Sequence, residues 1–132
     1  MTIIKKASGA NSFSLKKRLK SFRYAAQGIK QAVVSQHNMW IHLGAAFLVV
    51  VFGFLLKIGF IEWMLLVFAM GFVLSAEIFN SSIEVLTDLV SPEINSRAGL
   101  VKDMAAGAVL VAAITAAIIG LLVFVPKLIA IL

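Results

Sequence analysis

Apolar residues recur at helical spacing near the start of the chain. From Leu15 to Val33 they follow one another at intervals of four, three, four, three and four residues, and lysine, arginine and glutamine lie mostly between them. This pattern predicts an amphipathic helix over residues 13–34, whose basic face suits a membrane interface. A helix packed on a partner is the alternative. The polar stretch before it, residues 1–12, predicts a mobile tail.

Three longer apolar runs follow, and together they predict a transmembrane domain over residues 35–132. The expected spans are about 39–57, 61–90 and 100–125, which at about 1.5 Å per residue cover most or all of a hydrocarbon core. Polar breaks at 35–38, 57–61 and 93–99 predict two turns and a loop. Ser91-Pro92 and Pro126-Lys127 predict where the second and third helices end, because proline disfavours helix at the preceding residue. The third run carries a stripe of small residues that lets helices approach closely in lipid, at Ala105, Ala112, Ala116 and Gly120.

The composition excludes an ordinary soluble domain. Of the 132 residues, 61% are hydrophobic and only 14% are charged, whereas soluble domains are nearer half apolar and a quarter charged. We therefore expect an all-α integral membrane protein, with an N-terminal surface helix and three transmembrane helices. The chain has no cysteine, which excludes disulfides, thiolate zinc sites and a cysteine nucleophile. Its N-terminus lacks the short apolar core of a cleavable signal peptide.

The basic residues are concentrated at the N-terminal end. Eight of the twelve lie within the first 30 residues, and no acid precedes Glu62. Beside apolar spans, such an arm favours an anionic lipid surface over nucleic acid as its partner. The distribution of basic residues also predicts that the N-terminus and the loop around Arg97 and Lys102 are cytoplasmic and that the C-terminus is outside.

The stretch from Ser75 to Asp88 places its acids on one face of the second span. At about 100° per residue, Glu84 lies about 20° from Glu77 in one direction and Asp88 about 20° in the other, with Asn80 and Ser81 beside them. Near a bilayer, such carboxylates are costly to desolvate, so a cation or a bound proton must offset them. A solvated helix end is one interpretation, and a metal and acid–base site at the membrane boundary is the other.

No conventional nucleotide-binding or hydrolase motif accompanies these acids. The sequence contains no GxxxxGK[ST], GxGxxG, GxSxG or HExxH. Hard oxygen ligands suit Mg²⁺, and phosphoryl transfer needs such a metal, cations for the phosphates and a carboxylate near the attacking hydroxyl. These groups could meet at the cytoplasmic interface. Three helices from one chain enclose little space, so a homo-oligomer with sites between subunits is expected. His37 and His42 have no ligand spacing, which indicates hydrogen-bonded or interfacial histidines.

The acidic stretch and the residues that follow it resemble the signature of a known family. AEIFNSSIEVLTDLVSPEINSRAGLVKDMAAGAVL, residues 76–110, resembles the signature of the prokaryotic diacylglycerol kinase family, which includes undecaprenol kinases. That signature is an E-x-x-N-[ST]-x-I-E-x-x-x-D core, a loop, and [AV]-K-D-x-[AG]-[AS]-[AG]-A-V-L. Upstream, FSLKKRLKSFRYAAQGIK resembles the family's interfacial helix, and the similarity extends from Phe13 to about Leu128.

The resemblance implies a homotrimeric lipid kinase of the bacterial cytoplasmic (inner) membrane that takes ATP and Mg²⁺ from the cytoplasm and a lipid from the bilayer. Glu77 matches the family's general base, Asn80 a residue supporting the reacting groups, and Glu84 a Mg²⁺ ligand. The remaining positions match residues around the nucleotide: Lys17, Tyr24, Asp88, Glu93, Lys102 and Asp103. Gln36 stands where the family has a glutamate that serves as a further Mg²⁺ ligand, so weaker metal binding is expected.

Two alternatives to an active lipid kinase follow from the same residues. One is a small membrane carrier whose acids bind protons or cations, although the acids lie at one edge of the span and no inverted repeat is visible. The other is a catalytically weakened kinase homologue, which the Gln36 departure suggests. Diacylglycerol and undecaprenol both present a primary hydroxyl, and the FVPKL tail favours the branch containing undecaprenol kinases.

Overall fold

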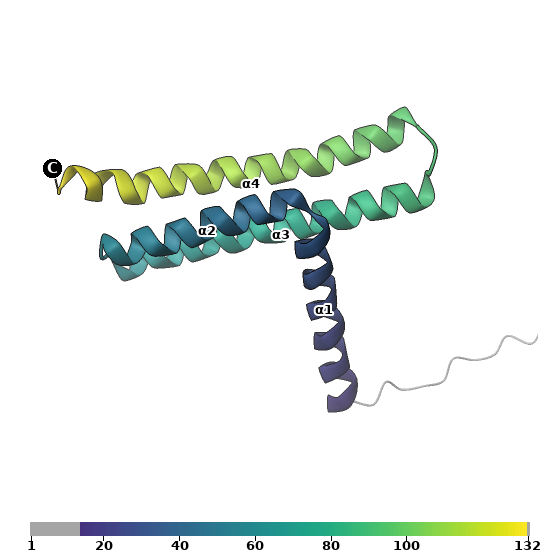
Figure 1. The fold of residues 1–132 in the computed structure, drawn as a ribbon, viewed down its shortest axis with the longest axis horizontal. Helices are drawn as coiled ribbons and strands as arrows, with labels where there is room; N and C mark the ends of the chain where they lie inside the picture. The colour runs from purple at the N-terminus through teal and green to yellow at the C-terminus, as the bar shows by residue number, and fades with distance from the viewer. Residues whose placement is uncertain (1–13, 132) are drawn as a thin grey trace, which may run out of the picture.

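The structure, a computed structural model, describes residues 14–131, and these form four α-helices (Figure 1). They are α1 (Leu15–Ser35), α2 (His37–Leu55), α3 (Phe60–Val90) and α4 (Ser96–Ile129). The expected all-α class is confirmed, and α2, α3 and α4 are each long and apolar enough to cross a membrane. The predicted mobile tail, residues 1–12, lies outside the described residues.

The most extensive packing is between α3 and α4, and α2 packs mainly on α3. Small and β-branched residues make the α3–α4 contact, with Ala69 and Val73 of α3 and Ala105 and Ala112 of α4 all buried. Small side chains let two backbones approach closely where lipid supplies no hydrophobic drive between helices. Of the predicted small-residue stripe, Ala105 and Ala112 are buried, whereas Ala116 and Gly120 line a pocket.

A tight turn joins α2 to α3 at the end of the bundle that holds the C-terminus. Gly53 is buried there because Trp63 packs across it, and a Cβ at residue 53 would lie 2.6 Å from the indole ring. Lys57 adopts a φ of 47°, in the left-handed region. Lys127 of α4 binds Glu62 of α3 at 3.2 Å, so the same end of the bundle is also joined by an ion pair.

Three sequence-predicted boundaries are wrong because polar residues or proline did not interrupt the helices where expected. Residue 36 alone separates α1 from α2, since an extended backbone at Gln36 lets a new helix restart at once in another direction. Residues 96–99 are helical, because Asn95 caps α4 by accepting a hydrogen bond from the Arg97 amide at 2.9 Å. Pro126 lies inside α4, which continues to Ile129, as prolines in membrane helices often allow.

Helix α1 leaves the bundle partway along the length of α3 and α4. It leaves α2 steeply, and beyond that level only α3 and α4 continue, to the loop that joins them (Figure 1). At 31 and 34 residues, these helices measure about 46 and 51 Å, longer than a hydrocarbon core of about 30 Å. The part of α3 and α4 on this side of α1 is therefore an overhang, and we use that name for it below.

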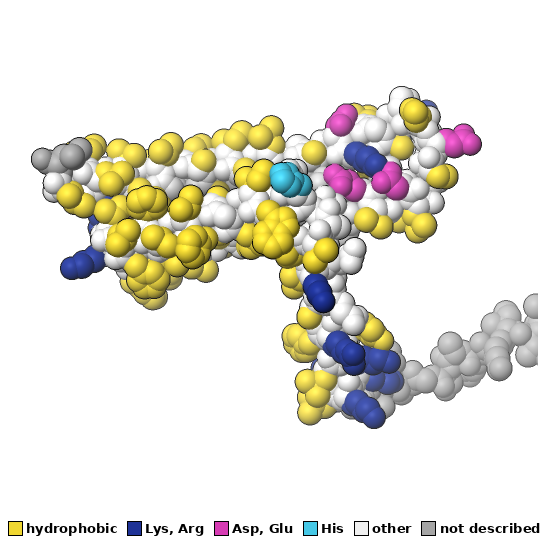
Figure 2. All heavy atoms as spheres, viewed as in Figure 1, with side chains coloured by type: hydrophobic (Ala, Val, Ile, Leu, Met, Phe, Trp, Pro, Cys, Tyr) yellow, Lys and Arg dark blue, Asp and Glu magenta, His cyan; other side chains and the backbone are white. Residues whose placement is uncertain are grey.

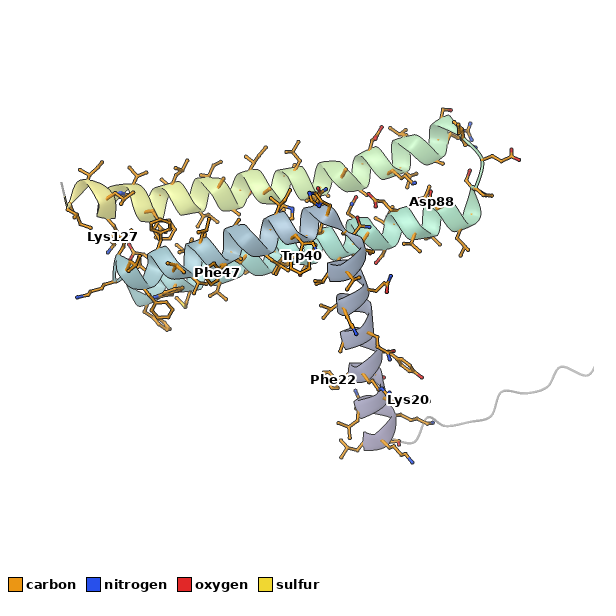
Figure 3. All side chains as sticks on the ribbon, in the orientation of Figure 1. Lys20, Phe22, Trp40, Phe47, Asp88 and Lys127 are labelled. Carbon is orange, nitrogen blue, oxygen red and sulfur yellow. The ribbon has the colours of Figure 1, made fainter. Side chains whose placement is uncertain are left out.

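The two sides of α1 differ in chemistry. Its hydrophobic side chains gather on the side toward the bulk of the bundle, and its lysines and arginines gather on the side toward the overhang (Figure 2). Lys20 and Phe22 show the contrast, since they point in opposite directions from the helix (Figure 3). A helix lying in a membrane interface orients its faces in this way, with the apolar side toward the acyl chains.

Candidate active site

Acids gather on the overhang (Figure 2), whereas Glu62 lies at the opposite end of the bundle, beside Lys127. Helix α3 carries Asp88 into the overhang, facing α4 close to the connecting loop (Figure 3), and Glu84 lies one turn earlier, beside Gln36 where α1 meets α2. Glu77 lies about two turns before Glu84 on the same face of α3, since a spacing of seven residues completes nearly two helical turns. The carboxylates therefore form a line along α3 from the buried bundle toward the open end.

Glu77 is the most deeply buried of these acids. Its side chain is 1% exposed, and neither carboxylate oxygen has a hydrogen-bond partner among the described residues. Nε2 of His42, on α2, lies 3.8 Å from Oε2 of Glu77. A carboxylate without hydrogen bonds in such a place is costly. Unsatisfied acceptors of this kind are available to a substrate proton or cation.

Glu84 has the hydrogen bonds that Glu77 lacks. Nδ2 of Asn80 donates to Oε1 at 3.0 Å, and Nε2 of Gln36 donates to Oε2 at 3.3 Å. The residue between α1 and α2 thus contacts the middle of the acidic line on α3. Oδ1 of Asn80 is buried and has no hydrogen-bond partner within residues 14–131, so this oxygen is also free to bind a ligand.

A pocket of about 300 Å³ contains these groups. Its polar lining comprises Asn38, His42, Glu77, Asn80 and Glu84, and α4 closes the other side with small and aliphatic side chains; we call it the acidic pocket. An apolar pocket of about 260 Å³ lies next to it between α2 and α4, over α3, and His42 and Ala113 line both. A lipid chain in the apolar pocket would thus bring its polar end toward Glu77.

The remaining predicted nucleotide residues on the overhang form a second group. Lys102 of α4 binds the carboxylate of Asp88 in an ion pair. Asp88, Glu93 and Lys102 line one pocket of about 250 Å³ beside the α3–α4 loop. Asp103 is exposed, next to Lys102. Lys102 and the acids near it therefore lie between the acidic pocket and the α3–α4 loop end of the overhang.

Two predicted nucleotide residues lie elsewhere. Lys17 and Tyr24 are exposed on α1, and neither lines the acidic pocket or the pocket around Lys102. The Tyr24 ring instead lies 5.7 Å from the ammonium of Lys20, a cation–π distance. Within one chain, the structure does not bring these two residues together with Glu77.

His42 is a site residue that sequence reasoning did not assign. The sequence indicated a hydrogen-bonded or interfacial histidine, whereas the structure places its ring beside Glu77 at the boundary of the two pockets. The sequence did show that His42 interrupts the apolar run between Met39 and Leu56. It could not show that Glu77 is the neighbour of His42, because the two residues are 35 positions apart and lie on different helices.

The oxygen donors fit Mg²⁺ only as part of a shared coordination shell. Among the described residues, no three histidine, aspartate or glutamate side chains are placed to hold a metal together. Glu84 and the unpaired Oδ1 of Asn80 supply hard oxygen atoms, and Gln36 currently presents its amide N–H to Glu84. Mg²⁺ commonly binds one or two carboxylates and completes its shell with water and substrate phosphates, so this donor set fits it.

Comparison with known proteins finds a matching family and several relatives. The family model for prokaryotic diacylglycerol kinase matches residues 23–124. The chain is 40% identical to an undecaprenol kinase of Bacillus subtilis, over 86% of this chain and 93% of that protein. It is 36% identical to a diacylglycerol kinase of Synechocystis, over 86% and 66% of the two chains, and 31% identical to a diacylglycerol kinase of Escherichia coli, over 82% and 88%.

Proposed function

The chain belongs to the prokaryotic diacylglycerol kinase family and is a lipid kinase, and we propose that it transfers the γ-phosphoryl group of ATP to the primary hydroxyl of a membrane lipid. The observation that carries this proposal is the position of Glu77. Its unpartnered carboxylate lies in the acidic pocket, next to an apolar pocket suited to a lipid chain. That junction is where a lipid hydroxyl and a phosphate can meet.

Glu77 acts as the general base in this proposal. A free carboxylate oxygen accepts the hydroxyl proton as the lipid oxygen attacks the γ-phosphorus, and the bond from that phosphorus to the bridging oxygen of ADP breaks. Burial protects the carboxylate from water, so the hydroxyl does not compete with solvent for it. Such a base contributes about 10²- to 10⁴-fold to rate.

Glu84 and Asn80 would act on the phosphates of ATP indirectly, by holding Mg²⁺. When Mg²⁺ is bound, it neutralises charge on the transferring phosphates. Glu84 would hold it, with the Asn80 Oδ1 and the side chain of Gln36 nearby. Lys102 and the acids around it lie further out on the overhang, where the remainder of the nucleotide would bind.

The overhang and the acidic pocket are cytoplasmic in this proposal. Six lysines and arginines of α1, together with Arg97 and Lys102 near the α3–α4 loop, lie on this side, and basic residues are retained in the cytoplasm. ATP is available there. The same α1 orientation, with its apolar side toward the bundle, supports an inner-membrane protein whose surface helix lies on the cytoplasmic leaflet.

A homotrimer completes the proposal. Lys17 and Tyr24 do not reach the acidic pocket of their own chain, and many large apolar side chains of α3 and α4 remain exposed. Neighbouring copies would cover part of that surface and could bring one chain's α1 to another chain's pocket. Cross-linking in native membranes, followed by denaturing electrophoresis, would give a trimer band that dilution with detergent does not remove.

The test of function is phosphate transfer from γ-labelled ATP by purified protein in mixed micelles. Undecaprenol and diacylglycerol are offered separately, because relatives with each name match the chain. We expect a labelled lipid phosphate from at least one alcohol and none with Glu77→Gln. Glu62→Gln is the matched control, since Glu62 is on the same helix at the opposite end and binds Lys127. No transfer to either lipid, with Mg²⁺ saturating, would favour a carrier or an inactive homologue.

A further inference from the structure

His42 has no role in the reaction described so far, yet its ring lies beside the carboxylate of the proposed base, Glu77. Its side chain is 18% exposed, and its Nε2 atom lies 3.8 Å from Oε2 of Glu77. It lines both the acidic pocket and the apolar pocket. A lipid that extends from one pocket into the other would lie beside this ring.

Two neighbouring donors on α3 already have other acceptors. The amide of Asn80 donates to Glu84, and the hydroxyl of Ser81 donates to the backbone oxygen of Glu77 at 2.8 Å, not to its carboxylate. Glu84 itself is an acid and repels a second negative charge. Nε2 of His42, 3.8 Å from Oε2, is a ring nitrogen placed to approach the Glu77 carboxylate.

We propose that His42 is a positioning residue for Glu77. Its Nε2–H donates to Oε2 of Glu77, which fixes the carboxylate and leaves Oε1 to accept the proton of the lipid hydroxyl. The two atoms need to approach by only about 0.6 Å to reach an ordinary N–H···O distance. This inference rests on the proposed role of Glu77 as the base, and it adds a residue from α2 to a reaction otherwise assigned to α3 and α4.

The same contact ties the base to the lipid. Because His42 also lines the apolar pocket, a chain bound there presses against the ring that orients Glu77. An apolar replacement at residue 42 would still contact that chain but could not orient the carboxylate, so it should affect turnover more than binding. Hydrogen bonds to a charged group are among the stronger ones in proteins, so loss of this one should lower the rate substantially.

The first test separates turnover from binding with two variants. We expect His42→Leu to lower kcat by about 10- to 100-fold while KM for ATP and for the lipid stays within about twofold, because the lost interaction orients the base. His42→Gln keeps an N–H donor of similar reach and should recover most of the lost rate. His37→Gln is the matched control, since His37 is exposed and lies on the same helix. Equal kcat in wild type and His42→Leu would overturn the proposal, as would a His42→Gln variant no better than His42→Leu.

The second test reads the contact without turnover. The chain has two histidines, so His37→Gln protein labelled with ¹⁵N-histidine gives a single imidazole spectrum. We expect the Nε2–H signal of His42 to carry the shift of a donor to a carboxylate and to move when Glu77→Gln is added. A signal indifferent to Glu77 would overturn the inference even in an active kinase. Conversely, inactivity of the wild type would defeat the proposed function while leaving this measurement of the contact intact.

Discussion

Glu77→Met should make the protein more stable while abolishing its activity. Glu77 is 1% exposed and neither of its oxygens has a hydrogen-bond partner, so the folded state bears most of the cost of desolvating the group. Methionine has a similar length and no polar atom. Relief of an unsatisfied buried group is worth about 1–3 kcal/mol, and more where the group is charged. His42 would lose a neighbour, but its ring is 18% exposed and water can replace it.

The measurement is thermal unfolding in one detergent, followed by circular dichroism and by loss of the monodisperse peak after heating. For a domain of this size, 1 kcal/mol corresponds to roughly 3–5 °C, so we expect a rise of several degrees. Glu84→Met is the matched control because Glu84 accepts bonds from Gln36 and Asn80. Its removal leaves a buried amide donor unpaired and should lower the melting temperature. A lower melting temperature for Glu77→Met would refute the reasoning, since it would mean that a contact such as the one proposed from His42 stabilises the folded protein by more than burial of the carboxylate costs.

Three further predictions concern other parts of the molecule. Gln36→Glu should lower the Mg²⁺ concentration for half-maximal activity by roughly tenfold, because it adds a carboxylate beside Glu84; an unchanged Mg²⁺ titration would contradict a metal site there. Lys102→Ala should raise KM for ATP several-fold and change unfolding stability by less than about 1 kcal/mol, because its ion pair with Asp88 is largely exposed; an unchanged KM would remove Lys102 from the nucleotide site. Gly53→Ala should lower stability by about 1–3 kcal/mol in thermal unfolding, because its Cβ would lie 2.6 Å from Trp63, whereas Gly71→Ala, with nothing within 4 Å, should raise it by up to about 1 kcal/mol.

The periodicity of the chain predicted the helices better than their ends. Apolar runs of about 20 residues or more have few alternatives to a membrane helix, so α2, α3 and α4 were expected from composition alone. The ends depend on local capping that hydropathy does not report. Asn95 starts α4 within a stretch that looked like a loop, and Pro126 fails to stop that helix near its last turn.

The candidate site was predictable where one helix supplies it. Glu77, Asn80 and Glu84 share a face of α3 by spacing alone, and the observed Asn80–Glu84 bond follows from an i, i+4 separation. Contacts between helices were not predictable without a family pattern. His42 meets Glu77 only because α2 packs on α3 at that register, and the sequence of α2 does not state that register.

Gln36 links the tilt of α1 to the contact with Glu84 in the candidate site. It is the one residue between α1 and α2, its backbone N–H still bonds back to Ala32 at 3.1 Å, and its side chain reaches Glu84. A joint of one residue has no slack, so any tilt of α1 relative to the bundle must be absorbed by the φ and ψ angles of Gln36. Those same angles set the direction in which its side chain leaves the backbone. The inclination of the helix on the membrane surface and the hydrogen bond from Gln36 to Glu84 are therefore coupled, and lipids that alter the first would alter the second.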